Sequence, residues 1–345
     1  MRFALGFKWL LICHAAVASD VTLTEETNGH WRDFLNYQAT ADFYTRAIHS
    51  DRHEQWGGEF VAGLDAYGKW SNQNRDIATI VLQVYAGRIE NHPLGIPVYE
   101  GGNDWDLFAK ITSVNFHLSP TRRFNVKLGH FEIPYGLEAS INSNGTLRQF
   151  SHPSNLGQKL DWGATINGTF PTFQYEVGLS RGSGMDYHSK GNPYALSGRI
   201  GTPIDTENFW GTSSYGVSFY QAELLRPTGG IQDRWRIGVD GQHYMGPIGL
   251  LGEASIGETA GQDTVNLLAE INASNARETI LVYNQFRWIR QRTAGAWDES
   301  GSSAIGVRYA PDNHWAFSTQ FTQELWQLEG IPTNQVFLMQ LRYRF

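Results

Sequence analysis

Short segments in which apolar and polar residues alternate recur along most of the chain. Between 232 and 243, for example, Trp235, Ile237 and Val239 alternate with the polar residues Arg234, Arg236, Asp240 and Gln242. Successive side chains of a β-strand point to opposite faces, so each segment predicts a strand with one apolar face. The pattern slips near Thr112, which indicates a β-bulge. We expect strands at 35–48, 58–70, 75–88, 104–118, 123–133, 159–170, 172–181, 192–200, 212–225, 232–243, 246–258, 263–274, 277–290, 302–310, 313–327 and 335–345.

The connections between these sixteen strands alternate in length. The even-numbered ones at 71–74, 119–122, 171, 244–245, 275–276 and 311–312 are short, whereas 49–57, 89–103, 134–158, 182–191 and 291–301 are long. Short turns at one end and long loops at the other, with an even strand number, are typical of transmembrane β-barrels. The connection 201–211 is too long for its place and indicates a misplaced boundary. We therefore predict an all-β fold, an antiparallel transmembrane barrel of about 16 strands over residues 35–345.

The amino end indicates export. Arg2 supplies a basic start, Leu5 to Val17 are mostly apolar, and Ala16-Val17-Ala18 forms an A-x-A cleavage site. We predict a signal peptide at 1–18 and a short periplasmic segment at 19–34; the alternative is an ordinary buried strand or helix. Cys13, the one cysteine of the chain, lies in the predicted signal peptide, so the mature protein is expected to lack disulfides.

Composition narrows the function classes. A 13% aromatic content argues against intrinsic disorder, and a net charge of −7 argues against a nucleic-acid partner. After residue 18 no uncharged apolar run is long enough for a membrane helix. We find no metal-binding or nucleotide-binding motif and expect no cofactor. Ser140, Ser143, Ser151 and His152 crowd one loop, but spacing alone does not make a catalytic site, and we predict no enzymatic activity.

The carboxyl end resembles the final strand of bacterial outer-membrane β-barrels, which the barrel-assembly machinery reads. The alternative is the last strand of a soluble sandwich. One face of this strand is apolar and aromatic and ends on the terminal residue. The resemblance implies that this face is the assembly signal; its residues are Phe337, Met339, Leu341, Tyr343 and Phe345.

The longest connection, 134–158, follows the fifth predicted strand. The segment from Phe124 to Glu138 contains Gly129-His-Phe-Glu-Ile-Pro-Tyr-Gly136 and resembles the strand-to-third-loop junction of the phosphate-selective porin O/P family. That resemblance implies a third loop folded into the barrel, where it narrows the pore. The chain lacks the run of Arg and Lys that would form a basic ladder, so we do not expect phosphate selectivity.

The polar faces of the predicted strands carry nearly balanced charge. The cations are Arg46, Lys69, Lys127, Arg199, Arg234, Arg236, Arg287, Arg308, Arg342 and Arg344; the anions are Asp42, Asp65, Asp161, Glu176, Asp240, Glu253, Glu270 and Glu324. Selectivity needs one sign at the narrowest point, so we predict weak ion selectivity, with most charges paired along the wall. The positions expected near the constriction are Lys127, Glu138, Arg148, His152 and Asp161.

These observations predict a porin of the cell outer membrane through which small hydrophilic solutes or ions diffuse passively. We expect outer-membrane lipid and the barrel-assembly machinery as partners, and a homotrimer by analogy with resembling porins. The twelve Trp residues are expected mainly in aromatic girdles, the alternative being a stacking track for sugars in the lumen. The alternative function is a structural or scaffold barrel that houses or binds a partner protein.

Overall fold

The structure is a computed structural model of the chain. It describes residues 35–52, 54–72, 75–90, 104–141, 143, 145–185, 192–203, 206–208, 211–226, 230–293, 295–327 and 332–345. The predicted signal peptide and periplasmic segment lie outside these residues. Among the described residues, no helix has the length and apolar character needed to cross a membrane.

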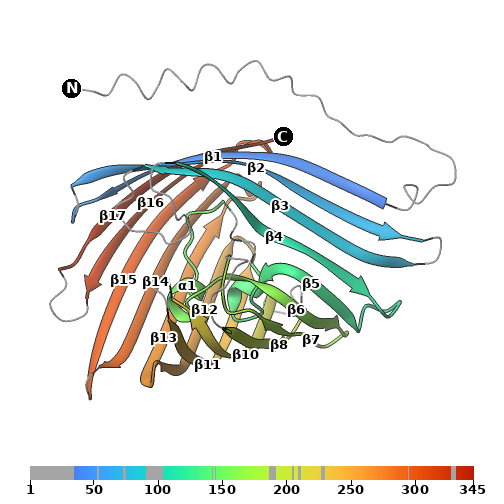
Figure 1. The fold of residues 1–345 in the computed structure, drawn as a ribbon. Coiled ribbons are helices and arrows are strands. Elements are labelled where there is room, and N and C mark those ends of the chain that lie inside the picture. Colours follow the sequence, from blue (N-terminus) through green and yellow to red (C-terminus); the bar gives the residue numbers. More distant parts are fainter. Residues whose placement is uncertain are drawn as a thin grey trace.

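The chain forms a closed antiparallel β-barrel (Figure 1). From β1 to β8 and from β10 to β17 each strand pairs with the next, and β17 pairs with β1 to close the sheet. The short β9 and the longer β8 pair with successive parts of β10, so together they fill one of sixteen positions. The strands are β1 (Leu35–Ser50), β2 (Gln55–Ser71), β3 (Asp76–Glu90), β4 (Trp105–His117), β5 (Asn125–Glu132), β6 (Leu160–Thr169), β7 (Gln174–Ser180), β8 (Tyr194–Gly201), β9 (Thr206–Asn208), β10 (Gly211–Leu225), β11 (Ile231–Met245), β12 (Ile248–Thr259), β13 (Gln262–Ser274), β14 (Ile280–Thr293), β15 (Ala296–Tyr309), β16 (Trp315–Trp326) and β17 (Gln335–Arg344).

The alternation in the sequence separates the two faces of the barrel. On β1, Phe43 is 44% exposed on the outside, whereas its neighbours Asp42 and Tyr44 are 0% and 7% exposed and face inward. Trp70 and Trp235 lie on the outer face with the other exposed apolar side chains, as expected for a girdle. A strand with one apolar and one polar face therefore defines this wall along most of its circumference.

Two predicted connections were too long. The connections expected at 49–57 and 291–301 are only 51–54 and 294–295. The strands β1, β2, β14 and β15 extend beyond the segments in which apolar and polar residues alternate. Arg292 pairs with Trp297 and Thr293 with Ala296, so the hairpin continues through a polar stretch. Backbone pairing needs no apolar face once a strand leaves the lipid, which explains the difference. The long 201–211 connection contains β9, and the register shift expected near Thr112 is present between β3 and β4.

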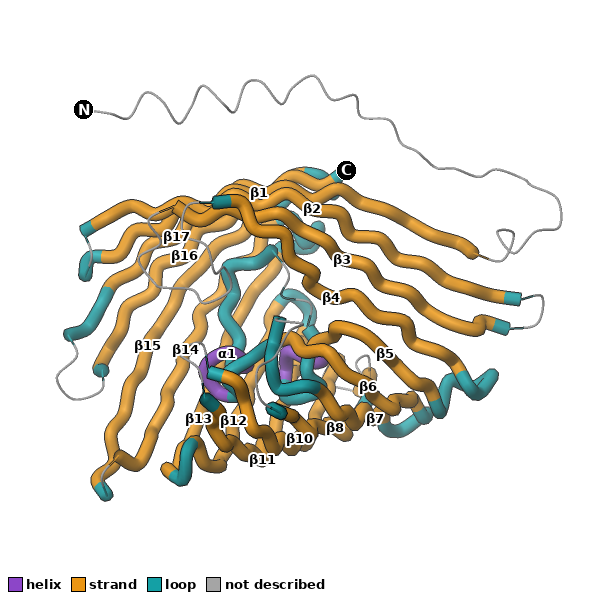
Figure 2. The backbone as a smooth tube through the Cα atoms, viewed as in Figure 1, coloured by secondary structure: helices purple, strands orange, loops and turns teal. Residues whose placement is uncertain are grey.

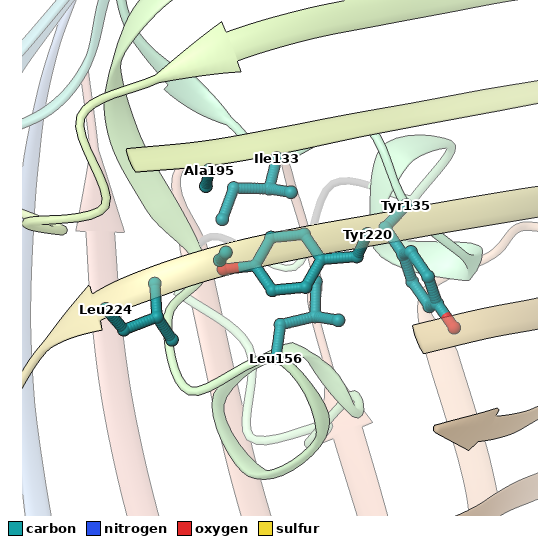
Figure 3. Close-up of a cluster of buried hydrophobic side chains, with 7 residues drawn as sticks. Ile133, Tyr135, Leu156, Ala195, Tyr220 and Leu224 are labelled. Atoms are coloured by element: carbon teal, nitrogen blue, oxygen red, sulfur yellow. The ribbon is translucent and has the colours of Figure 1, made fainter. Parts of the chain in front are cut away.

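Residues 133–159, called the third loop below, fold into the barrel between β5 and β6 (Figure 2). This segment contains a 3-10 turn, η3 (Leu137–Ala139), and a single helical turn, α1 (His152–Asn155). Its apolar side chains pack on the inner wall at three places: beside β8 and β10, beside β12 and β13, and beside β17 and β1. Figure 3 shows the first, where Ile133, Tyr135 and Leu156 of the loop form one cluster with Tyr220 of β10. Burying a Leu or Phe side chain contributes about 1.5–3 kcal/mol, so these contacts favour the position of the loop inside the barrel.

Candidate functional site: the third loop across the lumen

Hydrogen bonds from five wall strands hold the backbone of the third loop. They occur on β10, β11, β12, β14 and β17, which lie on different parts of the circumference, so the loop crosses the lumen instead of following one strand. The Gly136 N–H donates to Ser218 Oγ (3.0 Å), Leu137 N–H to Glu253 Oε2 (2.9 Å), Gln149 N–H to Gln285 Oε1 (3.0 Å), and Gln340 Nε2 to the Gly145 carbonyl (2.6 Å).

Two of these contacts require glycine. Gly136 and Gly145 have φ of 55° and 68°, a conformation that side chains rarely adopt. A Cβ atom at Gly136 would lie 2.0 Å from Oε2 of Glu253, and one at Gly145 would lie 2.4 Å from Cζ of Arg342. The loop therefore turns where its backbone presses against charged side chains of the wall.

Asn155, at the end of α1, anchors the returning half of the loop. Its side chain is fully buried, and its Oδ1 accepts from Arg236 Nε (2.8 Å) and from Asn266 Nδ2 (2.9 Å). Its carbonyl accepts from Arg234 Nη1 (3.0 Å). One residue thus ties the loop to β11 and β13. This role could not be predicted from the sequence, because an Asn in a polar loop carries no signal of the residues that it contacts.

A cluster of charges lies where the loop leaves and rejoins the wall. The ammonium of Lys159 lies 2.9 Å from Glu138 Oε1 and 3.1 Å from Glu132 Oε1, and it also contacts Ser143 Oγ. His152 Nδ1 is 3.3 Å from Glu138 Oε2, and its Nε2 is 2.6 Å from the Tyr135 carbonyl. Glu132, Glu138 and His152 bring their ligand atoms within 4.8 Å of one another, but both carboxylates already form ion pairs with Lys159.

The charges of this cluster stabilise one another. Burial alone would raise the pKa of the Glu138 carboxyl, but His152 and Lys159 lower that pKa below its usual range. Burial alone would lower the pKa of the Lys159 ammonium, but Glu138 and Glu132 raise it above its usual range. Both groups therefore stay charged around neutral pH and fix the base of the loop.

The five residues expected near the constriction occupy four separate surroundings. Glu138 and His152 belong to the cluster at the base of the loop, and Asp161, fully buried, accepts from the Gly182 N–H at 2.6 Å. Arg148, in the crossing part of the loop, forms an ion pair with Glu270 of β13, with its Nε 3.1 Å from Oε2. Lys127 of β5 forms an ion pair with Glu176 of β7, with its Nζ 2.7 Å from Oε1. The structure therefore brings only Glu138 and His152 into direct contact.

The remaining charges of the inner wall mostly pair with opposite charges. Each pair joins two strands: Arg46–Glu59 (2.8 Å), Arg199–Asp240 (2.6 Å), Arg342–Asp42 (2.5 Å) and Arg344–Asp65 (2.9 Å). Glu59, Glu132 and Lys159 were not among the charged residues predicted for the lumen. Glu59 could have been found, because it follows the same alternation as Asp65 on β2.

Comparisons with known proteins show the fold. No family model matches the sequence, and no curated protein matches it. The solved structures that it resembles include an anion-selective porin from Comamonas acidovorans (12% identity, 90% of this chain, 100% of that chain, TM-score 0.62). OprB from Pseudomonas putida (11%, 90%, 94%, 0.66) and OmpT, an outer-membrane protein of Vibrio cholerae in its trimer form (11%, 90%, 99%, 0.64), are similar to the same extent. The fold is thus that of porin-like outer-membrane barrels, and the resemblance to the phosphate-selective porin O/P family stays a prediction.

Proposed function

We propose that the protein is an outer-membrane porin through which small hydrophilic solutes and ions diffuse with weak selectivity. The observation that carries the proposal is the sixteen-position barrel whose polar inner wall is crossed by an anchored loop. Side chains cannot fill a barrel of this width, so a water-filled passage remains beside the loop. The ten cations and eight carboxylates expected on the inner wall are close to balance, and several of them form ion pairs between strands, which supports weak selectivity.

The constriction is proposed to lie beside the third loop. Arg148 and Lys127 keep 13% and 22% of their side chains exposed and would meet the solute. Glu138, His152 and Asp161 are buried and would act by holding the loop in place. Export through a cleaved signal peptide, assembly by the barrel-assembly machinery, outer-membrane lipid as surroundings and a homotrimer, as in the trimer form of OmpT, belong to the same proposal.

Liposome swelling tests this function. Liposomes that contain the refolded protein are transferred to solutions of sugars of increasing size, and uptake is measured as the rate of swelling. We expect swelling with small sugars that falls steeply with solute size. A folded barrel that admits no sugar would contradict the porin and favour a scaffold for a partner protein.

A further inference from the structure

A cavity of about 240 Å³, lined by both apolar and polar groups, lies between the third loop and the inner wall of β13–β16. It lies toward the end of the barrel from which the loop enters, since Asn266 and Thr322 are near that end of their strands. Hydroxyl and amide groups make up most of its polar lining. The side chains that carry the argument are Ser151 and Ser154 of the loop, Asn266, Ser302, Arg287 and Glu324.

Arg287 differs from the arginines that form ion pairs along the inner wall. Arg46, Arg199 and Arg342 each form an ion pair with a carboxylate of the barrel. Within the part of the chain that the structure describes, the Arg287 guanidinium forms neither an ion pair nor a side-chain hydrogen bond, although it lines the cavity. Its donors are therefore available to a group that enters the cavity.

Glu324, the acidic residue of the lining, does not neutralise Arg287. Its Oε2 already lies 2.9 Å from Nη2 of Arg52. The two arginines and one carboxylate leave one uncompensated positive charge. A guanidinium presents its N–H groups as a planar fork that matches a carboxylate, and such charge-assisted bonds are stronger than neutral ones.

We propose that this cavity binds small monocarboxylates that also carry hydroxyl groups. The carboxylate pairs with Arg287, and the hydroxyls bond to the surrounding serine, amide and threonine groups. A second negative charge would lie near Glu324 and is disfavoured, and a neutral sugar would leave Arg287 unpaired. This proposal rests on the proposed function, because the solute reaches the cavity through the lumen.

The test uses the full-length protein in planar bilayers with potassium chloride, to which gluconate is added as the probe. In the wild-type channel, gluconate should block the chloride current in a saturable way, whereas glucose should block far less. Arg287→Gln should raise the gluconate concentration for half-maximal block by roughly tenfold, the loss expected for a charged hydrogen bond. Arg308→Gln removes a lumen-facing cation near the opposite end of β15 and serves as the matched control, with block unchanged.

The outcomes separate this proposal from the function on which it rests. If the wild-type channel conducts and admits glucose, but gluconate does not block in a saturable way, the carboxylate site is wrong and the porin stands. Equal block in Arg287→Gln and wild type would also overturn the site. If the folded protein does not conduct at all, the porin itself is wrong.

Discussion

The anchor at Asn155 makes a quantitative prediction about the third loop. Asn155→Ala removes the acceptor of one hydrogen bond from a charged donor, Arg236 Nε, and of one from a neutral donor, Asn266 Nδ2. These bonds are worth about 1.5–3 and about 1 kcal/mol, so the substitution weakens the attachment of the loop by about 3 kcal/mol. Since 1.4 kcal/mol is a factor of ten, the detached fraction of the loop should rise about 100-fold.

Single-channel recording measures this change as time spent in current levels other than the main open level. Asn155→Asp is the matched control, because a carboxylate keeps the acceptor for both bonds and adds an ion pair with Arg236. It also sacrifices little, since the buried Asn155 Nδ2 has no hydrogen-bond partner among the described residues. We expect frequent level changes in Asn155→Ala and wild-type behaviour in Asn155→Asp. If wild type and Asn155→Ala spent the same time outside the main open level, the proposed role of Asn155 as an anchor would be refuted.

Three further predictions concern the base of the loop, the barrel seam and the terminal strand. The pKa of Glu138 is lowered from 4.5, so its contribution to holding the loop is present above pH 4.5 and lost below it; the time that the channel spends outside its main open level should therefore increase only below pH 4.5. The pKa of Lys159 is raised from 10.5, so its contribution is lost only above pH 10.5. A change in the time outside the main open level near pH 7 would contradict both expectations. Asp42→Asn leaves the Arg342 guanidinium without its carboxylate where β1 meets β17 and should cost about 3–5 kcal/mol, seen as a lower melting temperature; an unchanged value would contradict this. Deleting Phe345, which stacks on Phe43 with ring centroids 5.9 Å apart, should slow insertion into membranes measured by gel shift, and unaltered kinetics would argue against the assembly signal.

The strands could be predicted from the sequence because lipid and water impose opposite requirements on their two faces. Trp235 and Arg236 illustrate this: their alternation alone places one outside and the other inside. Where strands extend beyond the lipid, the requirement vanishes, and the start of β15 at Ala296 could be located only from its pairing with β14. The entry of the third loop into the barrel was inferred from its length and its resemblance, and the structure confirms it.

The contacts of the loop could not be predicted from the sequence, because they depend on the path of the chain across the lumen. Lys159 bridges Glu132 and Glu138 only after residues 133–159 have folded back, and nothing in their spacing indicates this. Asn155 meets Arg236 across 81 positions of the chain. The charged residues of the wall were easier to predict, since each lies on the inner phase of its strand, but their individual partners follow from the register between strands.

The most direct test of the central claim is the single-channel conductance of the refolded wild-type protein in planar bilayers, with the reversal potential measured across a salt gradient. A water-filled barrel with a paired inner wall predicts a stable open level and a small reversal potential. A large reversal potential of either sign would contradict the weak selectivity. A folded protein without conductance would contradict the porin.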